Sequence, residues 1–369
     1  DHLLAFLRDE SQPWLVRAHC PRSLTRLCNA NLSSGEQELY RERIANELLA
    51  LLAPRAKQPV ELVQSSALAL GQLGTNDLAN PLDRRILEAL AGLPKDVSDQ
   101  QTRHFSLIAL AQIGARTAAD AQDPEGGIEF ASKSLLAQLA GGKSAMPSWA
   151  GLACGVLGHG LAASSPESSR IAALQAAVRS ALAEERSGER IGALAVSAGI
   201  QKDLEASGHL LQLLRSSKDE ETQGYVALGL GLMGASEAVV EIHDVLAQSK
   251  YRPALLKQAA IALGLLGDKN AVDFLTAQLA SAQGLATQAA LSTALGFIGD
   301  TRSVDPLVAM LQNGSLTPKA RGFAAAALGM VADEAELPWN SAVGLDLNYR
   351  ASTSTLTDQA SGTGILDIL

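Results

Sequence analysis

Apolar residues recur along most of the chain at intervals of three and four, the spacing that places them on one side of an α-helix. In the stretch 268–299, apolar residues keep this spacing over 272–279, and a polar break follows at Gln283 and Gly284. A second apolar helix is then expected over 286–298. The following 33 residues repeat this plan. The pattern therefore predicts helical hairpins that cover one another's apolar sides.

A segment of the form Ala-Leu-Gly-x-Leu-Gly closes the second helix of each predicted hairpin. Its clearest copies are 69–74, 109–114, 262–267 and 294–299. With weaker copies it returns eight times, ending at positions 74, 114, 158, 199, 234, 267, 299 and 332. The last four intervals are 32 to 35 residues, and repeats of this length are typical of stacked helical arrays. The sequence thus predicts an all-α solenoid, an α-α superhelix of about eight helical-hairpin repeats.

The two glycines of this signature have different expected roles. The first lies inside a predicted helix, where glycine costs about 1 kcal/mol relative to alanine. We expect the close approach of a neighbouring helix to offset that cost. The last glycine is expected to end the helix in a left-handed conformation, as is common at helix C-termini. The first glycine recurs at Gly71, Gly155, Gly231, Gly264, Gly296 and Gly329.

Three parts are expected along the chain. They are a degenerate N-terminal helical cap over 1–35, a repeat array over 36–333, and an extended tail over 334–369 that packs on the last repeats. A cap is expected because the first layer of an array must cover an open apolar end. The first three intervals are 40 to 44 residues, and insertions in repeat proteins fall on one face, often the binding face. Exposed loops are expected at 117–127, 141–147 and 164–169.

Composition narrows the classes of partner. Hydrophobic residues make up 47% of the chain and aromatic residues 4%, so burial must come from Ala, Leu, Val and Ile on closely packed helices. The formal net charge is -9, which disfavours nucleic acid because phosphate binding needs clustered Lys and Arg. No run of 18 apolar residues is present, so membrane insertion is not expected. A protein is the expected partner.

The position nine residues before the end of each signature holds four aromatic residues in the eight repeats. If it faces the concave surface, these rings form a ladder of anchors of the kind that dominates protein interfaces. If it faces between layers, they belong to the core. The full set is Ser65, Phe105, Trp149, Arg190, Tyr225, Gln258, Ala290 and Phe323.

Three neighbouring residues, His104, Lys257 and Arg321, are expected to face solvent and to supply polar contacts. The predicted protein-binding residues are therefore His104, Phe105, Trp149, Arg190, Tyr225, Lys257, Arg321 and Phe323.

Two patterns suggest chemistry but have simpler interpretations. Residues 229–234 fit G-x-G-x-x-G, which binds dinucleotides only where a strand precedes it and a helix follows. Here it ends a predicted helix, in the same frame as 262–267. Cys154 and His159 could form a nucleophile and its base, but Cys154 holds the core place of Leu110 in another repeat. No catalytic residue and no cofactor is expected.

Histidines, acidic residues and cysteines are the candidates for metal or disulfide chemistry. The six histidines are scattered without repeated His-Glu pairs, which disfavours metal catalysis. Asp120, Asp123 and Glu125 could gather around calcium, although without the usual loop spacing a solvated acidic loop is the default. No metal site is expected. Cys20 and Cys28 could be bridged if the helix between them breaks, or could be buried free thiols.

The two-helix layer, the Ala-rich second helix and the signature, followed by Asp at Asp268, Asp300 and Asp333, resemble HEAT repeats. They look most like the short bacterial kind also found in phycobilin lyase subunits. The segments 346–350 and 364–369 are similar to the end of HEAT-repeat proteins of planctomycete-type bacteria, many of which carry export signals. That similarity alone favours an exported or periplasmic location over the cytoplasm.

The resemblance covers about residues 36–333, and it implies a function without catalysis. A protein of this kind is expected to be a protein-binding scaffold or a structural subunit of a larger bacterial assembly. Binding is expected through the concave helix face and the loops of the N-terminal half. The alternative is a phycobilin lyase-like chromophore-transfer protein or its accessory subunit.

Overall fold

The computed structural model describes residues 1–332 apart from 30–33, 54–56 and 142–144. The predicted all-α fold is confirmed, because every regular element in this part of the chain is helical. The predicted tail over 334–369 lies outside the described residues. The helices are α1 (His2–Arg8), α2 (Trp14–Arg17), α3 (Cys20–Cys28), α4 (Ser34–Leu52), α5 (Val60–Leu73), α6 (Pro81–Asp96), α7 (Gln100–Gly114), α8 (Pro124–Leu139), α9 (Met146–Ser164), α10 (Ser169–Glu184), α11 (Gly188–Ile200), α12 (Ser207–Ser216), α13 (Glu220–Met233), α14 (Val239–Gln248), α15 (Pro253–Leu265), α16 (Ala271–Ser281), α17 (Leu285–Ile298), α18 (Val304–Gln312) and α19 (Pro318–Ala332).

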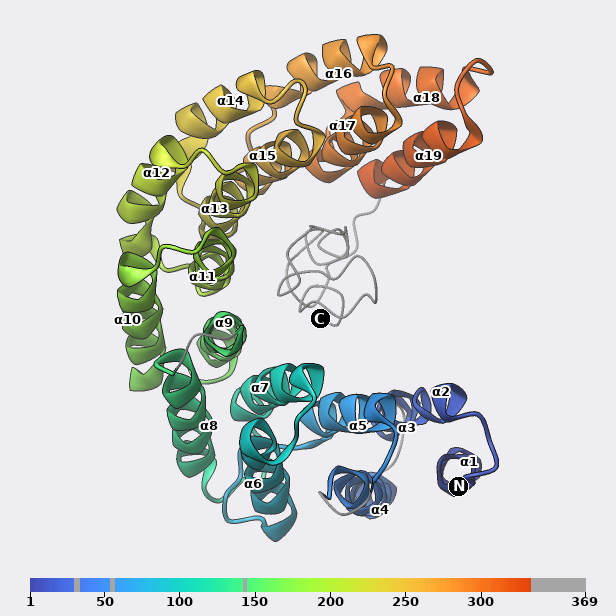
Figure 1. The fold of residues 1–369 in the computed structure, drawn as a ribbon, viewed down its shortest axis with the longest axis vertical. Coiled ribbons are helices and arrows are strands. Elements are labelled where there is room, and N and C mark those ends of the chain that lie inside the picture. The colour runs from blue at the N-terminus through green and yellow to red at the C-terminus, as the bar shows by residue number, and fades with distance from the viewer. Residues whose placement is uncertain (30–33, 54–56, 142–144, 333–369) are drawn as a thin grey trace. The chain divides into compact units, whose positions relative to one another are not determined.

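Two compact units, Asp1–Val178 and Arg179–Leu369, divide the chain. In the first unit, α4 packs on α5, α6 on α7 and α8 on α9, while α3 packs on α4 and α5. In the second unit, α12 packs on α13, α14 on α15, α16 on α17 and α18 on α19. The second helices of these hairpins form a row in each unit: α5, α7 and α9 in the first, and α11, α13, α15, α17 and α19 in the second (Figure 1). Each unit is a HEAT-like stack of helical hairpins, and eight helix pairs follow α3 along the chain.

Helix α6 shows how the sequence builds a first helix. The side-chain oxygen of Asn80 accepts hydrogen bonds from the N–H groups of Leu82 and Asp83, which would otherwise have no partner within the helix. Pro81 takes the first helical position, where a missing N–H costs little. The buried apolar residues then recur at helical spacing, at Leu82, Ile86, Leu87, Leu90 and Leu93.

The internal glycine of the signature marks the contact between successive second helices. A Cβ atom on Gly71 would lie 2.6 Å from the Cα atom of Ala109 on α7. On Gly231 and Gly296, the corresponding distances to a Cα atom of the next second helix are 2.9 and 3.1 Å. Gly329 on α19 differs, because nothing in the described part of the chain lies within 4 Å of such an atom. Close approach of the next second helix is therefore confirmed at Gly71, Gly231 and Gly296.

The expectation for the last glycine of the signature is confirmed at Gly234, Gly267 and Gly299, and it is wrong for the three signatures of the first unit and for Gly199. Gly234, Gly267 and Gly299 have φ angles of +79°, +73° and +65°. Gly74 has an extended conformation, and Gly114 lies within α7. Helix α9 continues past the third signature to Ser164. The left-handed cap thus accompanies the shorter repeats, in which the chain turns at once into the next layer.

One signature was placed out of register by the sequence pattern. The left-handed residue after α11 is Lys202, with a φ of +52°, and the N–H of Asp203 donates to the carbonyl of Ala198 at 3.0 Å. This is the bond that closes a Schellman cap. Gly199 instead has the role of the internal glycine at the contact between second helices, because a Cβ atom there would lie 2.5 Å from the carbonyl oxygen of Gly229 on α13. The repeat therefore ends at 202, and the next interval is 32 residues.

The connection before α8 is shorter and better anchored than the predicted loop over 117–127. Helix α8 begins at Pro124, and the Asp123 carboxylate accepts a hydrogen bond from the N–H of Gly126 at 3.1 Å. The N–H of Asp123 donates to the carboxylate of Asp77 at 2.8 Å. The connection between α7 and α8 is thus hydrogen-bonded to the connection between α5 and α6.

The other two predicted loops fare differently. The loop over 164–169 is confirmed, since α9 ends at Ser164 and α10 begins at Ser169. Part of the loop over 141–147 lies outside the described residues, and α9 already begins at Met146.

The glycine contacts predict opposite effects for the same substitution. Gly71→Ala should lower the free energy of unfolding by about 2 kcal/mol, because the new methyl group meets backbone that cannot move aside. Gly329→Ala should raise it by up to about 1 kcal/mol, because no described residue obstructs the new methyl group and alanine has the higher helix preference. Urea denaturation followed by circular dichroism measures both. Equal changes in the two variants would contradict the packing role of this position.

Candidate binding surface

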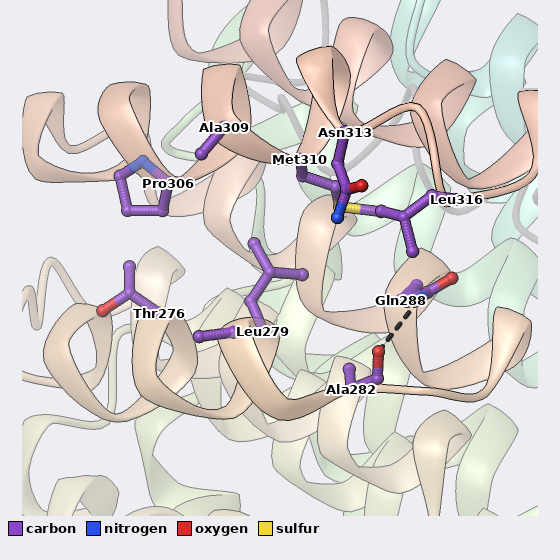
Figure 2. A pocket seen from close by; sticks show the side chains of 10 residues that line it. Thr276, Leu279, Ala282, Gln288, Pro306, Ala309, Met310, Asn313 and Leu316 are labelled. Carbon is purple, nitrogen blue, oxygen red and sulfur yellow. Dashed lines mark hydrogen bonds between the residues drawn. The ribbon is translucent and has the colours of Figure 1, made fainter.

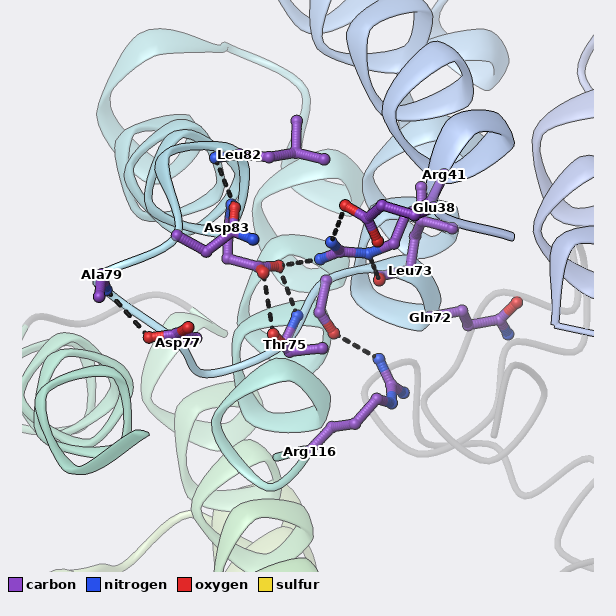
Figure 3. A network of polar contacts seen from close by, with 12 residues as sticks. Glu38, Arg41, Gln72, Leu73, Thr75, Asp77, Ala79, Leu82, Asp83 and Arg116 are labelled. Atoms are coloured by element: carbon purple, nitrogen blue, oxygen red, sulfur yellow. Dashed lines mark hydrogen bonds and ion pairs between the residues drawn. The ribbon is translucent and has the colours of Figure 1, made fainter. Parts of the chain in front are cut away.

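Asp83 is the centre of a buried polar cluster in the first unit (Figure 3). Its carboxylate accepts hydrogen bonds from the N–H of Thr75 at 2.7 Å and the hydroxyl of Thr75 at 2.9 Å, and forms an ion pair with Arg41. Arg41 also donates to the carbonyl of Leu73 at 3.1 Å. Asp83 is only 1% exposed. The cluster joins α4 to α6 and to the connection between α5 and α6.

Arg116 extends this cluster from the connection after α7. Its guanidinium donates to the carbonyls of Gly71 and Gly74, both at 2.8 Å. Burial, together with the nearby charge of Arg41, lowers the pKa of Arg116. The polar groups of the cluster bond to one another and to backbone groups of neighbouring helices and turns. We therefore interpret it as structural rather than as a site for a ligand.

The aromatic residues at the shared position are mainly core residues. Phe105, Trp149 and Tyr225 are 3%, 1% and 2% exposed. Phe105 and Trp149 pack edge to face, with ring centroids 6.3 Å apart. Of the two interpretations, the core is therefore the one that fits these three residues, and an exposed ladder of anchors is wrong for them. Phe323 on α19 is half-buried.

His104 does not face solvent, contrary to expectation. It is 6% exposed, and its ring stacks on Trp149 with centroids 4.8 Å apart and planes 11° apart. Its Nδ1 atom is buried and has no hydrogen-bond partner among the residues that the structure describes. Burial lowers the pKa of His104 to about 4, although Asp99 acts in the opposite direction. The neutral imidazole thus serves as a flat packing surface between α7 and α9.

Arg190 shared the aromatic position only because its repeat was placed out of register. With the repeat ending at Lys202, the equivalent residue is Ala193, which is fully buried. Arg190 itself is half-buried near the start of α11, where it pairs with Glu185 at 3.3 Å. Its assignment to the shared aromatic position was therefore wrong. Its predicted role in protein binding stays a prediction.

Lys257 and Arg321 are half-buried near the starts of α15 and α19. The Nε atom of Arg321 donates to the carbonyl of Leu311 at 2.7 Å. With Phe323, they lie close in sequence to the turns that connect the two helices of a hairpin. We call the turns 217–219, 249–252, 282–284 and 313–317 of the second unit, with the first residue of each following helix, the turn edge.

The turn edge carries exposed apolar side chains that the sequence pattern did not single out. Tyr251 is 87% exposed, and Leu285, the first residue of α17, is 41% exposed. Adjacent turns are connected, since Arg252 lies 3.8 Å from the carboxylate of Glu220 at the start of α13. The sequence does contain a signal for the exposed tyrosine, because an aromatic residue lies in a polar turn, Lys-Tyr-Arg-Pro over 250–253.

A pocket of about 220 Å³ opens beside the turn edge, between the last two hairpins (Figure 2). Helices α16, α17 and α18 and the turns that follow α16 and α18 supply its walls. The lining residues carry no charge. Gln288 is fixed in the wall, because its amide donates to the carbonyl of Ala282 at 2.8 Å. The pocket is lined by Thr276, Leu279, Ala280, Ala282, Gln288, Pro306, Ala309, Met310, Asn313 and Leu316.

The motifs that suggested chemistry have structural roles where the structure describes them. Cys154 is fully buried, and burial raises the pKa of its thiol to about 12, so it is not a ready nucleophile. Residues 229–234 end α13 with a left-handed glycine instead of beginning a helix, which excludes the dinucleotide-binding arrangement.

The cysteines and acidic residues of the N-terminal half can be placed as well. Cys20 and Cys28 are buried free thiols, as one of the two alternatives proposed. Asp123 caps α8, and within the described residues no group of three or more His, Cys, Asp or Glu could hold a metal ion. Among the described helices, none is long and apolar enough to cross a bilayer.

These features define a class of protein: an all-α repeat solenoid with an exposed turn edge and an uncharged pocket between two repeats. Residues 208–293 match the family of HEAT repeats. The match extends from α12 into α17, the stretch with the most regular repeat length. No curated protein matches the chain.

Proposed function

We propose that the protein is a non-catalytic, protein-binding scaffold or structural subunit of a larger assembly. The observation that supports this most directly is the turn edge of the second unit, where Tyr251 and Leu285 are exposed on consecutive repeats. Repeat arrays use such extended surfaces to bind other proteins. Large side chains with an apolar body and a polar tip, such as tyrosine, are favoured at protein interfaces.

This proposal moves the binding surface from the N-terminal half to the second unit. Phe105 and Trp149 cannot anchor a partner without leaving the core. Lys257, Arg321 and Phe323 remain candidates for contact, since each is half-buried and close in sequence to the turn edge. A bacterial assembly and an exported location remain parts of the proposal, supported only by the resemblance of the sequence.

The chromophore-transfer alternative gains no support from the pocket. A bilin is larger than a drug-sized ligand, for which pockets of about 300–1,000 Å³ are usual. At about 220 Å³ and without a charged lining residue, the pocket between α16 and α18 offers neither the room nor the polar groups that a tetrapyrrole requires.

The proposal predicts that binding depends on the turn edge. Tyr251→Asp combined with Leu285→Asp should reduce the recovery of partner proteins from an extract of the source organism at least ten-fold, because both changes place charge where apolar contact is expected. Quantitative mass spectrometry of the proteins retained by the immobilised full chain measures this. Val240→Asp is the matched control, since Val240 on α14 is 69% exposed but lies outside the turn edge.

Recovery of the same proteins by the wild type and the double variant would contradict the proposal. So would an equal loss with Val240→Asp. Circular dichroism of each variant establishes that the helices are retained.

A further inference from the structure

The pocket between α16 and α18 is suited to a single side chain. Its volume of about 220 Å³ is below the usual range for small-molecule sites. Leu279, Met310 and Leu316 supply apolar walls, and Ala309 stands exposed at the rim. No lining residue is titratable, so the pocket favours a neutral apolar group and excludes a charged one.

One polar group at the pocket is arranged to hold a peptide backbone. The Oδ1 atom of Asn313 accepts hydrogen bonds from the N–H of Ser315 at 3.0 Å and from its hydroxyl at 2.7 Å. These bonds fix the orientation of the amide. The Nδ2 atom makes no hydrogen bond to the described residues, and it is therefore available to donate to a carbonyl of a bound chain.

Oppositely charged residues flank the lining residues of the last hairpin along the chain. Asp305 directly precedes Pro306, and Lys319 follows Leu316 by three residues. Both are exposed, and neither forms an ion pair within the part of the chain that the structure describes. Along α18, Asp305 and Ala309 are separated by about 6 Å of helix rise. This equals about two residues of an extended peptide.

We propose that this pocket binds a leucine-sized side chain of an extended peptide segment in a protein partner. The segment carries a basic residue two positions to one side, facing Asp305, and an acidic residue two positions to the other side, facing Lys319. The Asn313 amide binds a carbonyl of the segment. This inference rests on the proposed protein-binding function and names the chemistry of the partner at one place on the turn edge.

Synthetic peptides test the proposal without a known partner. The probe is acetyl-Lys-Ala-Leu-Ala-Glu-amide, titrated into the full chain with 13C-methyl-labelled methionine. The methyl signal of Met310 should shift, and affinity should be at least ten-fold higher than for the peptide with alanine at the centre, because leucine buries more apolar surface. Peptides with lysine at both ends or glutamate at both ends should bind more weakly than the mixed peptide.

Two variants and a control assign the binding to the pocket. Ala309→Phe should abolish the Met310 shift by filling the rim, whereas Gln312→Phe, an exposed position on the same helix, should not. Asp305→Lys should reverse the preference, so that the peptide with glutamate at both ends binds best. This gain of affinity cannot result from misfolding.

Three results would overturn the proposal: equal affinity for the leucine and alanine peptides, an unchanged Met310 signal at saturating peptide, or an unaltered response in Ala309→Phe. Such a failure leaves the turn-edge pull-down untouched. Conversely, peptide binding with no partner lost from the turn-edge variant would count against the scaffold function alone.

Discussion

Replacing Asp83 with Asn is expected to lower the free energy of unfolding by about 3 kcal/mol. The substitution keeps the size of the side chain but leaves Arg41, whose side chain is 11% exposed, without its buried counter-charge. Breaking a buried ion pair from one side costs about 3–5 kcal/mol, because the remaining charge stays desolvated. The hydrogen bonds from Thr75 to Asp83 would also weaken.

Urea denaturation of the full chain, followed by circular dichroism, measures this effect. The matched control is Asp273→Asn, which removes an ion pair with Arg302 whose side chains are 46% and 78% exposed. Exposed pairs contribute little to stability, so the control should unfold close to the wild type. If the two variants had the same midpoint, Asp83 would not hold the layers together as inferred.

The second large effect is a loss of stability in mild acid, caused by His104. Its pKa is about 4 in the folded protein and about 6.5 in an unfolded chain. Between these values the unfolded state binds the additional proton, so stability is complete above pH 6.5 and falls as the pH drops towards 4. The difference corresponds to about 3 kcal/mol. The cost arises because a charged imidazole must be buried against Trp149.

The variant His104→Phe isolates this contribution, because phenylalanine retains a ring against Trp149 but cannot be protonated. Free energies of unfolding measured from pH 7 to pH 4 should fall less steeply for the variant than for the wild type. Apart from Asp99, whose carboxylate interacts with His104, the other titratable groups contribute alike to both curves and cancel in the difference. Parallel curves would show that His104 is not buried in its neutral form.

The hairpin plan was predictable because it rests on local rules. Helical spacing of apolar residues predicted a second helix over 286–298 and the same plan in the following 33 residues, and the structure has these second helices at Leu285–Ile298 and Pro318–Ala332. The cost of glycine inside a helix pointed correctly to close helix contact at Gly71. Each of these inferences needs only residues that are neighbours along the chain or in the next repeat.

The site was harder to predict, because exposure depends on how the layers pack. The place of Trp149 in the repeat does not show whether its side chain faces a groove or a neighbouring helix. In the structure Trp149 stacks against His104. The sequence pattern expects glycine at a left-handed cap, so it could not predict the cap at Lys202. The predicted repeat end was therefore three positions too early, and Arg190 was assigned to the aromatic position. The pocket combines residues of two hairpins and has no signature of its own.

The glycine contacts also determine where a unit can flex. At Gly231 and Gly296 the backbone lies almost directly on the backbone of the next second helix, so these contacts of α13 with α15 and of α17 with α19 leave little room for compression. Bending must therefore spread or close the first helices. If the pocket binds a side chain as proposed, bending at the last two hairpins would change the space between α16 and α18 and with it the affinity for that side chain.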